Sequence, residues 1–299
     1  MKILNVLLVL IFFSCQSEQG VKKDRVFVGN QKVSSKVLSK GKAIYLEYCM
    51  ACHGVNGDGN GPAAKGSNPP PRNFTQGLYK FGLVEDGGLP SDEDFARIIQ
   101  GGLKGTAMLK WDISDQQTYM VTQYIKTFAP QVWENKENIP GKKVTINPDP
   151  YSIARESSAI QKGKEVYHMV ANCQSCHRGY ATKDELNEMS QKYNDEPMTD
   201  FDEDLYLPKL QVSEYYFYDD KERTAQFVPP DFTWHNVRSG SSVEEIAMRL
   251  AAGVTGSGMP AWKGTIEDHE IWAVAYYVKS LMKLKDNKAA RKLFMSRLK

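Results

Sequence analysis

The sequence lacks several features that would place it in common classes of protein. Its one long apolar run covers residues 3–13, which is too short to cross a bilayer. No stretch sustains the alternation of apolar and polar residues that is typical of strands. The net charge is only +2 and identifies no partner by itself, so no nucleic-acid partner is predicted. With 41% hydrophobic and 25% charged residues, the composition is that of a soluble globular protein.

Cysteine is also scarce, but four of the five cysteines fall in two copies of one motif, CMACH at 49–53 and CQSCH at 173–177. Cys-x-x-Cys-His is the attachment pattern of haem c, in which two thiols bond to the haem and the histidine binds iron. The sequence therefore predicts two haems c. The residues concerned are Cys49, Cys52 and His53 in the first copy and Cys173, Cys176 and His177 in the second. A four-cysteine zinc site is the alternative, but it leaves the matched histidines unexplained.

The fifth cysteine, Cys15, follows the apolar run directly. A charged Lys2, a short apolar core and then Ser14-Cys15 resemble a bacterial export signal with a lipoprotein processing site. We therefore predict a signal peptide over 1–14, a lipid on Cys15 and an N-terminal tether over 15–36. The exported chain would lie on the periplasmic side of a bacterial membrane, anchored by lipid and without a transmembrane helix in its mature part. An ordinary signal peptide cut a few residues later is the alternative.

The chain repeats itself. Aligning Met108 with Met259 brings 91–108 over 242–259 without a gap and places Trp111 on Trp262. Further matched pairs of segments occur in the same order. They are PRNFT at 71–75 with PPDFT at 229–233, GKAIYLEYCMACH with GKEVYHMVANCQSCH, and 115–128 with 268–281. Landmarks that recur in one order indicate an internal duplication.

The segments between these landmarks have the apolar spacing of helices. Residues 40–48 and 162–171 lead into the two Cys-x-x-Cys-His motifs with helical periodicity. Ser91 followed by acidic residues predicts a capped helix that ends at Gly101-Gly102. Each repeat is therefore expected to be a small helical fold.

The order of these features resembles the class I cytochrome c fold, twice over. It runs helix, Cys-x-x-Cys-His, a loop rich in glycine and proline, helix, Gly-x-x-Met and a final aromatic helix. The resemblance covers about 37–129 and 157–282. It implies an all-α protein of two tandem cytochrome c-like helical domains, each wrapped around one covalently bound haem. The predicted domains are 37–130 and 153–299, joined by a linker over 131–152.

The resemblance also implies further site residues. The sixth ligands of the two irons would be Met108 and Met259, which share a glycine three positions before and a tryptophan three positions after. Of the other histidines, His235 is the best spare ligand. Other groups are expected near the haems. Pro70 or Pro71, and Pro229 or Pro230, would accept a hydrogen bond from the ligating histidines, while Lys65, Arg72 and Arg178 would pair with haem propionates.

Two charged segments have no counterpart in the first repeat. The insertion predicted over 184–226 holds 13 acidic and 3 basic residues between 184 and 222, whereas the tail over 283–299 has 7 basic residues and 1 acidic residue. The tail is predicted to be a solvated face. For the insertion, a surface that docks a redox partner and a cover for the second haem remain alternatives.

Together these features predict an electron carrier rather than an enzyme. It would shuttle electrons between a respiratory oxidoreductase and a terminal oxidase or reductase, with a redox protein as donor and another as acceptor. One alternative is a two-haem peroxidase-like enzyme, which would need an open distal face with polar groups. The other is a permanent haem subunit of a larger oxidoreductase complex.

Overall fold

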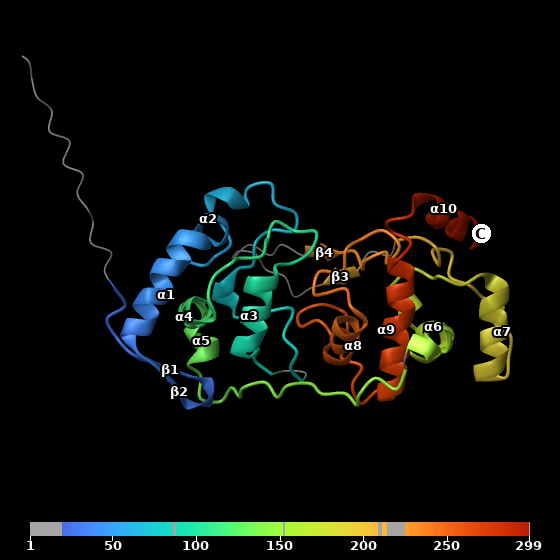
Figure 1. Ribbon diagram of the computed structural model, residues 1–299, viewed down its shortest axis with the longest axis horizontal. Helices are drawn as coiled ribbons and strands as arrows, with labels where there is room; N and C mark the ends of the chain where they lie inside the picture. Colours follow the sequence, from blue (N-terminus) through green and yellow to red (C-terminus); the bar gives the residue numbers. More distant parts are fainter. Residues whose placement is uncertain (1–19, 86–87, 152, 209–210, 214–224, 299) are drawn as a thin grey trace, which may run out of the picture.

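The computed structural model describes residues 20–298, apart from 86–87, 152, 209–210 and 214–224. The predicted signal peptide and Cys15 lie outside the described residues. The described chain forms two halves, each with its own buried core, joined by an extended segment along one edge (Figure 1). Within this part of the chain, no helix combines the length and apolar character needed to cross a membrane.

The first half is built from short strands and helices. In chain order they are β1 (Arg25–Phe27), η1 (Val28–Asn30), β2 (Gln31–Val33), α1 (Ser35–Tyr48), α2 (Met50–His53), η2 (Pro62–Ala64), η3 (Phe74–Gln76), α3 (Asp92–Gly101), α4 (Asp115–Lys126) and α5 (Pro130–Trp133). Strands β1 and β2 pair antiparallel, with Val26 opposite Lys32.

The second half repeats the helical part of this order. Its elements are η4 (Ile153–Arg155), α6 (Glu156–Glu165), η5 (Val166–Val170), η6 (Cys173–Ser175), α7 (Lys183–Asn194), β3 (Gln211–Ser213), β4 (Ala225–Phe227), α8 (Val243–Ala252), α9 (Asp268–Met282) and α10 (Lys288–Arg297). Strands β3 and β4 pair antiparallel. The described residues are mostly helical, which confirms the predicted all-α class.

The same helix crossing organises both halves. Helix α1 packs on α4, and α6 packs on α9 (Figure 1). A glycine lies at each crossing, because a Cβ on Gly41 would lie 2.0 Å from the carbonyl oxygen of Met120, and one on Gly163 would lie 2.0 Å from that of Ala273. Only glycine lets the backbones approach so closely. The two glycines occupy matched positions in the repeats, so the duplication extends to the packing of the helices.

The helices that precede the two methionine loops begin and end alike. Ser91 and Ser242 each form a capping box at the start of α3 and α8. Gly102 and Gly253 follow the last turns with φ of 68° and 66°, a left-handed conformation that suits glycine. The capped helix predicted from Ser91 to the glycine pair is confirmed.

The structure differs from the sequence prediction at the N-terminal tether over 15–36. Residues 25–33 form the β1–β2 hairpin, and Phe27 and Val33 are each only 2% exposed in the first core. The two strands have three residues each, too few to show a periodic pattern in the sequence. Burial of these two side chains makes the hairpin part of the first half.

The predicted linker over 131–152 is also packed at several points. Trp133 is buried in the first core, while Val144 is buried in the second. The extended part of this segment therefore joins the two halves through buried side chains. The basic tail is not simply solvated either, because Leu298 is buried and Phe294 of α10 packs on the second core.

The described part of the acidic insertion packs against the helix that leads to the second motif. Leu186 and Met189 of α7 are buried in a small cluster of their own. Ion pairs join α7 to α6, with Lys164 and Glu185 2.5 Å apart and Lys192 and Glu165 2.8 Å apart. The insertion therefore adds a layer to the second half.

Candidate haem-binding sites

Both Cys-x-x-Cys-His motifs fold into the same single helical turn. In the first, the amides of Cys52 and His53 donate to the carbonyl of Cys49 at 3.2 and 2.9 Å. In the second, the amides of Cys176 and His177 donate to the carbonyl of Cys173 at 3.2 and 2.8 Å. Each turn brings two thiols and one imidazole together, which is the arrangement that covalent haem attachment requires.

The second motif has two extra residues before its first cysteine, and the backbone absorbs them locally. Val166–Val170 form a π turn, which is wider than an α-helical turn. Asn172 then adopts the left-handed conformation, with φ of 44°. The chain thereby returns to the same geometry at Cys173.

Ring stacking holds both motif histidines, and a hydrogen bond also orients the first. The Nδ1 of His53 donates to the carbonyl of Arg72 at 3.0 Å, so Nε2 carries the lone pair that an iron ligand needs. His53 also stacks on Phe74 with ring centroids 4.4 Å apart and planes 18° apart. His177 stacks on Phe232 in the same way, at 5.0 Å and 19°.

The carbonyl partners correct one detail of the sequence prediction. Arg72, rather than Pro70 or Pro71, accepts the hydrogen bond from His53. In the second half Pro230 faces His177, although the contact lies outside normal hydrogen-bond geometry. Arg72 and Pro230 occupy matched positions in PRNFT and PPDFT, so the backbone position recurs while the residue type changes.

Burial sets the protonation of these groups. It lowers the pKa of His53, and it lowers the pKa of His177 to about 4, in both cases against the opposing effect of the facing carbonyl. Both imidazoles are therefore neutral at pH 7, which is the form that binds a metal. Burial also raises the pKa of the Cys49 and Cys173 thiols to about 12.

The zinc alternative finds no support in this geometry. All four motif cysteines are free of disulfide bonds, and the two pairs lie in separate halves, with Cys49 packed on the first core and Cys173 on the second, so they do not meet in one four-cysteine site. Across the described residues, no three or more His, Cys, Asp or Glu side chains gather where they could hold a metal ion. The residues present instead fit a tethered haem with one histidine ligand in each half.

A buried tyrosine locks each motif to the preceding helix. The hydroxyl of Tyr45 donates to the carbonyl of Gly54 at 2.7 Å, and that of Tyr167 donates to the carbonyl of Arg178 at 2.9 Å. Each acceptor is the residue directly after the histidine of the motif. The two tyrosines are 0% and 1% exposed. Their matched positions in GKAIY and GKEVY were visible in the sequence, but their role was not predicted.

The loops that carry Met108 and Met259 are also built alike. The amide of Leu103 donates to the carbonyl of Met108 at 2.8 Å, and that of Val254 donates to the carbonyl of Met259 at 3.1 Å. Inside each loop a side-chain hydroxyl, rather than a backbone carbonyl, accepts the hydrogen bond of the methionine amide. Thr106 Oγ1 accepts from the amide of Met108 at 3.1 Å, and Ser257 Oγ accepts from the amide of Met259 at 3.3 Å. Both methionines are partly buried, so each loop presents a thioether in a preformed frame.

Comparison with known families agrees with this duplicated geometry. The family model described as cytochrome c matches residues 38–129, and the model described as cytochrome c oxidase, cbb3-type, subunit III matches residues 158–278. The chain is a two-domain c-type cytochrome. Cytochrome c domains bind haem c, so the constellations around His53 and His177 are the places where the chain would hold it.

A solved structure resembles the cytochrome over most of its length. A chain of the Kuenenia stuttgartiensis reducing HAO-like protein complex superposes with a TM-score of 0.60 and 28% sequence identity. The match covers 81% of this chain and 95% of that chain. A search of curated proteins found no match.

The two candidate haem sites of the cytochrome differ in charge near the histidine. Asn73 in the first half accepts from the amide and hydroxyl of Thr75 at 2.9 and 2.7 Å. Its counterpart Asp231 makes the same two bonds with Thr233, at the same distances, but carries a charge. Arg178 at 2.6 Å and Arg291 of α10 at 3.3 Å pair with Asp231. Arg178, predicted to pair with a haem propionate, is thus bound to Asp231.

Two of the three remaining histidines of the cytochrome, His168 and His235, make hydrogen bonds within the second half. His168 is 1% exposed, donates from Nδ1 to the carbonyl of Lys164 at 2.7 Å and accepts at Nε2 from the amide of Tyr180 at 3.1 Å. Both ring nitrogens are occupied, so it is a core residue rather than a ligand. His235, the predicted spare ligand, is exposed and accepts at Nδ1 from the amide of Asp231 at 2.9 Å.

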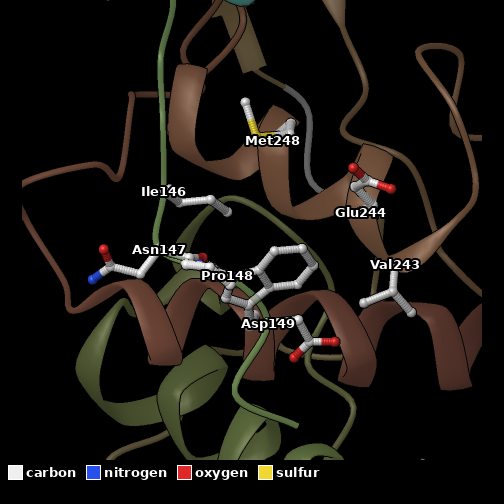
Figure 2. A pocket seen from close by; sticks show the side chains of 8 residues that line it. Ile146, Asn147, Pro148, Asp149, Val243, Glu244 and Met248 are labelled. Atoms are coloured by element: carbon white, nitrogen blue, oxygen red, sulfur yellow. Dashed lines mark hydrogen bonds between the residues drawn. The ribbon is translucent and has the colours of Figure 1, made fainter. Parts of the chain in front are cut away.

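A surface groove of the cytochrome lies away from both motifs. It has a volume of about 500 Å³ and lies between the joining segment and helices α8 and α9 (Figure 2). Its lining residues are Ile146, Asn147, Pro148, Asp149, Val243, Glu244, Met248 and Trp272. It contains neither a cysteine nor a histidine, so it is not a candidate haem site.

Proposed function

We propose that this cytochrome carries electrons through two haems c, one in each half. The observation that carries the proposal is the duplicated constellation itself: a Cys-x-x-Cys-His turn, a neutral histidine stacked on phenylalanine, and a framed methionine loop. When bound, each haem supplies a one-electron couple whose potential depends on its axial ligands and surroundings. The protein's part is to attach, orient and enclose it.

Each group in the constellation has a defined task in this proposal. Cys49 and Cys52 would attach the first haem, and His53 and Met108 would bind its iron. The second site uses the matched set of Cys173, Cys176, His177 and Met259. The carbonyl of Arg72 and the ring of Phe74 fix the plane of the His53 imidazole. A thioether opposite an imidazole raises the potential relative to two imidazoles.

Contacts between the halves support transfer from one haem to the other. Lys104 and Gly105 belong to the Met108 loop, and both meet the second half. The Nζ of Lys104 donates to Ser241 Oγ at 2.7 Å, and a Cβ on Gly105 would lie 3.0 Å from Nδ2 of Asn236. The Met108 loop thus packs on the second half, which favours direct electron transfer between the two sites within one protein.

The assembly partner is the second part of the proposal. The similar chain belongs to a reducing HAO-like protein complex and is matched over nearly its full length. This favours a permanent haem subunit of a larger oxidoreductase over a free shuttle between a respiratory oxidoreductase and a terminal oxidase or reductase. We further propose export to the periplasmic side and anchoring through a lipid on Cys15. Stable co-purification with an oxidoreductase would support the subunit, whereas isolation as a lone chain would support the shuttle.

Optical spectra with potentiometric titration test the carrier directly. Met108→Ala and Met259→Ala should each remove the optical signature of methionine ligation from one haem. The reduction potential of that haem should fall or its low-spin state should be lost, while the other haem is unchanged. Met248→Ala is the control, because Met248 lines the groove and lies outside the ligand register. A high-spin haem with peroxide turnover in the unaltered protein would instead support the peroxidase-like enzyme.

A further inference from the structure

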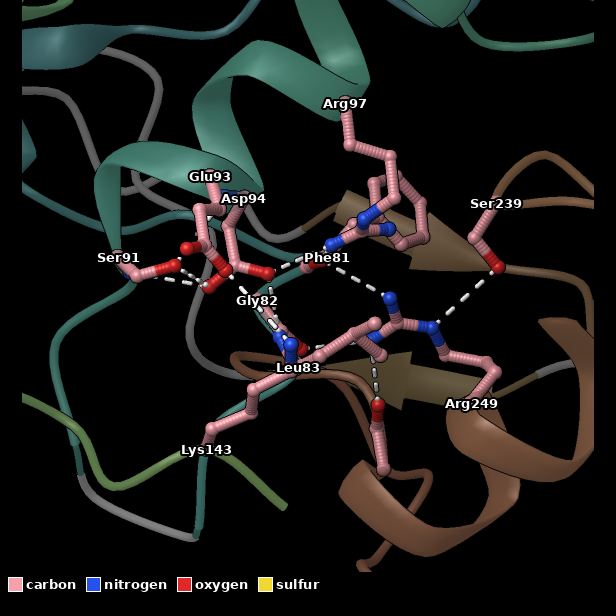
Figure 3. A network of polar contacts seen from close by, with 11 residues as sticks. Phe81, Gly82, Leu83, Ser91, Glu93, Asp94, Arg97, Lys143, Ser239 and Arg249 are labelled. Atoms are coloured by element: carbon pink, nitrogen blue, oxygen red, sulfur yellow. Dashed lines mark hydrogen bonds and ion pairs between the residues drawn. The ribbon is translucent and has the colours of Figure 1, made fainter. Parts of the chain in front are cut away.

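Arg249 in α8 is a buried cation whose hydrogen bonds cross from the second half to the first. Arg249 is only 5% exposed to solvent. Nη2 donates to the carbonyl of Phe81 at 2.9 Å, and Nη1 donates to the carbonyl of Gly82 at 2.9 Å (Figure 3). The guanidinium also lies 5.4 Å from the centroid of the Phe81 ring. One side chain thus binds the carbonyl groups of two consecutive residues of the first half.

The same guanidinium holds the base of the Met259 loop. Nη1 donates to the carbonyl of Gly253 at 3.0 Å, and Nε donates to Ser239 Oγ at 3.3 Å (Figure 3). Gly253 follows α8 directly, where the chain turns into the loop that carries Met259. Arg249 therefore connects a methionine loop of the second half to the backbone of the first.

The segment that receives Arg249 is itself fixed from both sides. The amide of Leu83 donates to Asp94 Oδ1 at 2.9 Å, and its carbonyl accepts from the amide of Val144 at 3.0 Å. The Leu83 side chain packs against the second core. Arg97 of the first half donates to the Phe81 carbonyl at 2.7 Å (Figure 3). Contacts from both halves therefore hold the Phe81–Leu83 segment in place where Arg249 binds it.

The chemistry of the junction suits orientation more than stability. A buried charge costs free energy unless all of its N–H groups donate hydrogen bonds. Replacing buried charged groups with apolar residues of similar volume often leaves the stability equal or greater. Arg249 instead directs a planar fork at carbonyl groups, which sets both distance and angle. Its counterpart in the first repeat is Ile98, so duplication alone does not account for it.

We infer that Arg249 is a positioning residue that sets the relative placement of the two haem sites and thereby the rate of electron transfer between them. The inference rests on the proposed function, because it needs a haem in each half. Arg249 touches no reacting atom. Its effect would pass through the Phe81–Leu83 segment on one side and the Gly253 turn on the other.

The experiment measures inter-haem electron transfer after rapid reduction of one haem in the full haem-loaded protein. Arg249→Met removes the fork, and Arg249→Lys keeps the charge while losing the planar geometry. Both should slow the transfer severalfold, because the rate of electron transfer falls steeply as the distance between the two haems grows. Hydrogen exchange at the amides of Leu83 and Val144 should quicken in parallel.

Arg155→Met is the matched control, because Arg155 is an exposed arginine of the second half that lies outside the junction. It should leave inter-haem transfer unchanged. A normal rate of inter-haem transfer in Arg249→Lys would overturn the inference, whatever the rate in Arg249→Met. If Arg249→Met fails to fold, the rate in Arg249→Lys decides the question. Absence of haem or of any inter-haem transfer in the unaltered protein would instead sink the proposed function.

Discussion

The tyrosines behind the two motifs allow a paired test at the scale of single residues. Tyr45→Phe should lower the free energy of unfolding by about 1 kcal/mol, the net value of one hydrogen bond, because the Gly54 carbonyl still accepts from the amide of Gly57 at 3.2 Å. Tyr167→Phe should cost more, up to about 3 kcal/mol, because no other described donor reaches the Arg178 carbonyl. Denaturant unfolding of the haem-loaded protein measures both.

Tyr119→Phe provides the control for this pair. Tyr119 is 40% exposed on α4, so loss of its hydroxyl should change stability by less than about 0.5 kcal/mol. Equal effects of all three substitutions would show that the buried tyrosines do not secure the motifs.

His168 makes stability depend on pH in a defined window. Burial lowers its pKa to about 4 from an ordinary value of 6.5. Between these values the unfolded chain binds a proton that the folded chain excludes, so stability is complete above pH 6.5 and falls as the pH drops toward 4. The loss should reach about 3–4 kcal/mol at most, from roughly 1.4 kcal/mol per pKa unit. His168→Gln should flatten this part of the curve of stability against pH, and an unchanged curve would contradict the assignment.

Residue types that carry chemistry could be predicted from the sequence, whereas backbone partners could not. The motif located His53 and His177, because their side chains are themselves the proposed ligands. The carbonyl that orients His53 comes from Arg72, and any residue type has a carbonyl to offer. The stacking of Phe74 and Phe232 on the histidines was signalled only by their matched positions in PRNFT and PPDFT.

At the scale of elements, the helix crossings provide the sharpest prediction. Gly41→Ala and Gly163→Ala would each place a Cβ 2.0 Å from a facing carbonyl oxygen, so α1 and α4, or α6 and α9, must separate. Overpacking of this kind should lower the free energy of unfolding by about 1–3 kcal/mol or more.

Gly101→Ala is the matched substitution for this test, because a Cβ there would meet no heavy atom within 4 Å. In the last turn of α3 it should be neutral or stabilising by up to about 1 kcal/mol. Thermal unfolding distinguishes the sets, and equal effects at all three positions would show that the crossings are not tightly packed.

Elements with a strong local signal were predictable, and those shaped by tertiary contacts were not. The capping box at Ser91 and the glycine pair Gly101-Gly102 at the end of α3 mark that helix in the sequence. The β1–β2 hairpin has no such signal, since it is stabilised by the burial of Phe27 and Val33 against distant residues. The turn Val166–Val170 widens only because the repeat has two extra residues to absorb there.

At the scale of the whole molecule, duplication predicts two similar halves but not how they meet. The repeats account for the two cores, the two helix crossings and the two methionine loops. The junction depends on residues without a counterpart, above all Arg249, whose place in the first half is taken by Ile98. Features outside the repeat could not be placed by aligning the halves, so the contact between them became visible only in the structure.

The central claim is that each half attaches one haem through its own pair of cysteines. Quantifying covalently bound haem per polypeptide in the purified protein tests this most directly, with Cys49→Ala/Cys52→Ala and Cys173→Ala/Cys176→Ala as paired variants. The account predicts two covalently bound haems in the unaltered chain and one in each variant. A chain that binds fewer than two haems, or a variant that keeps both, would contradict it.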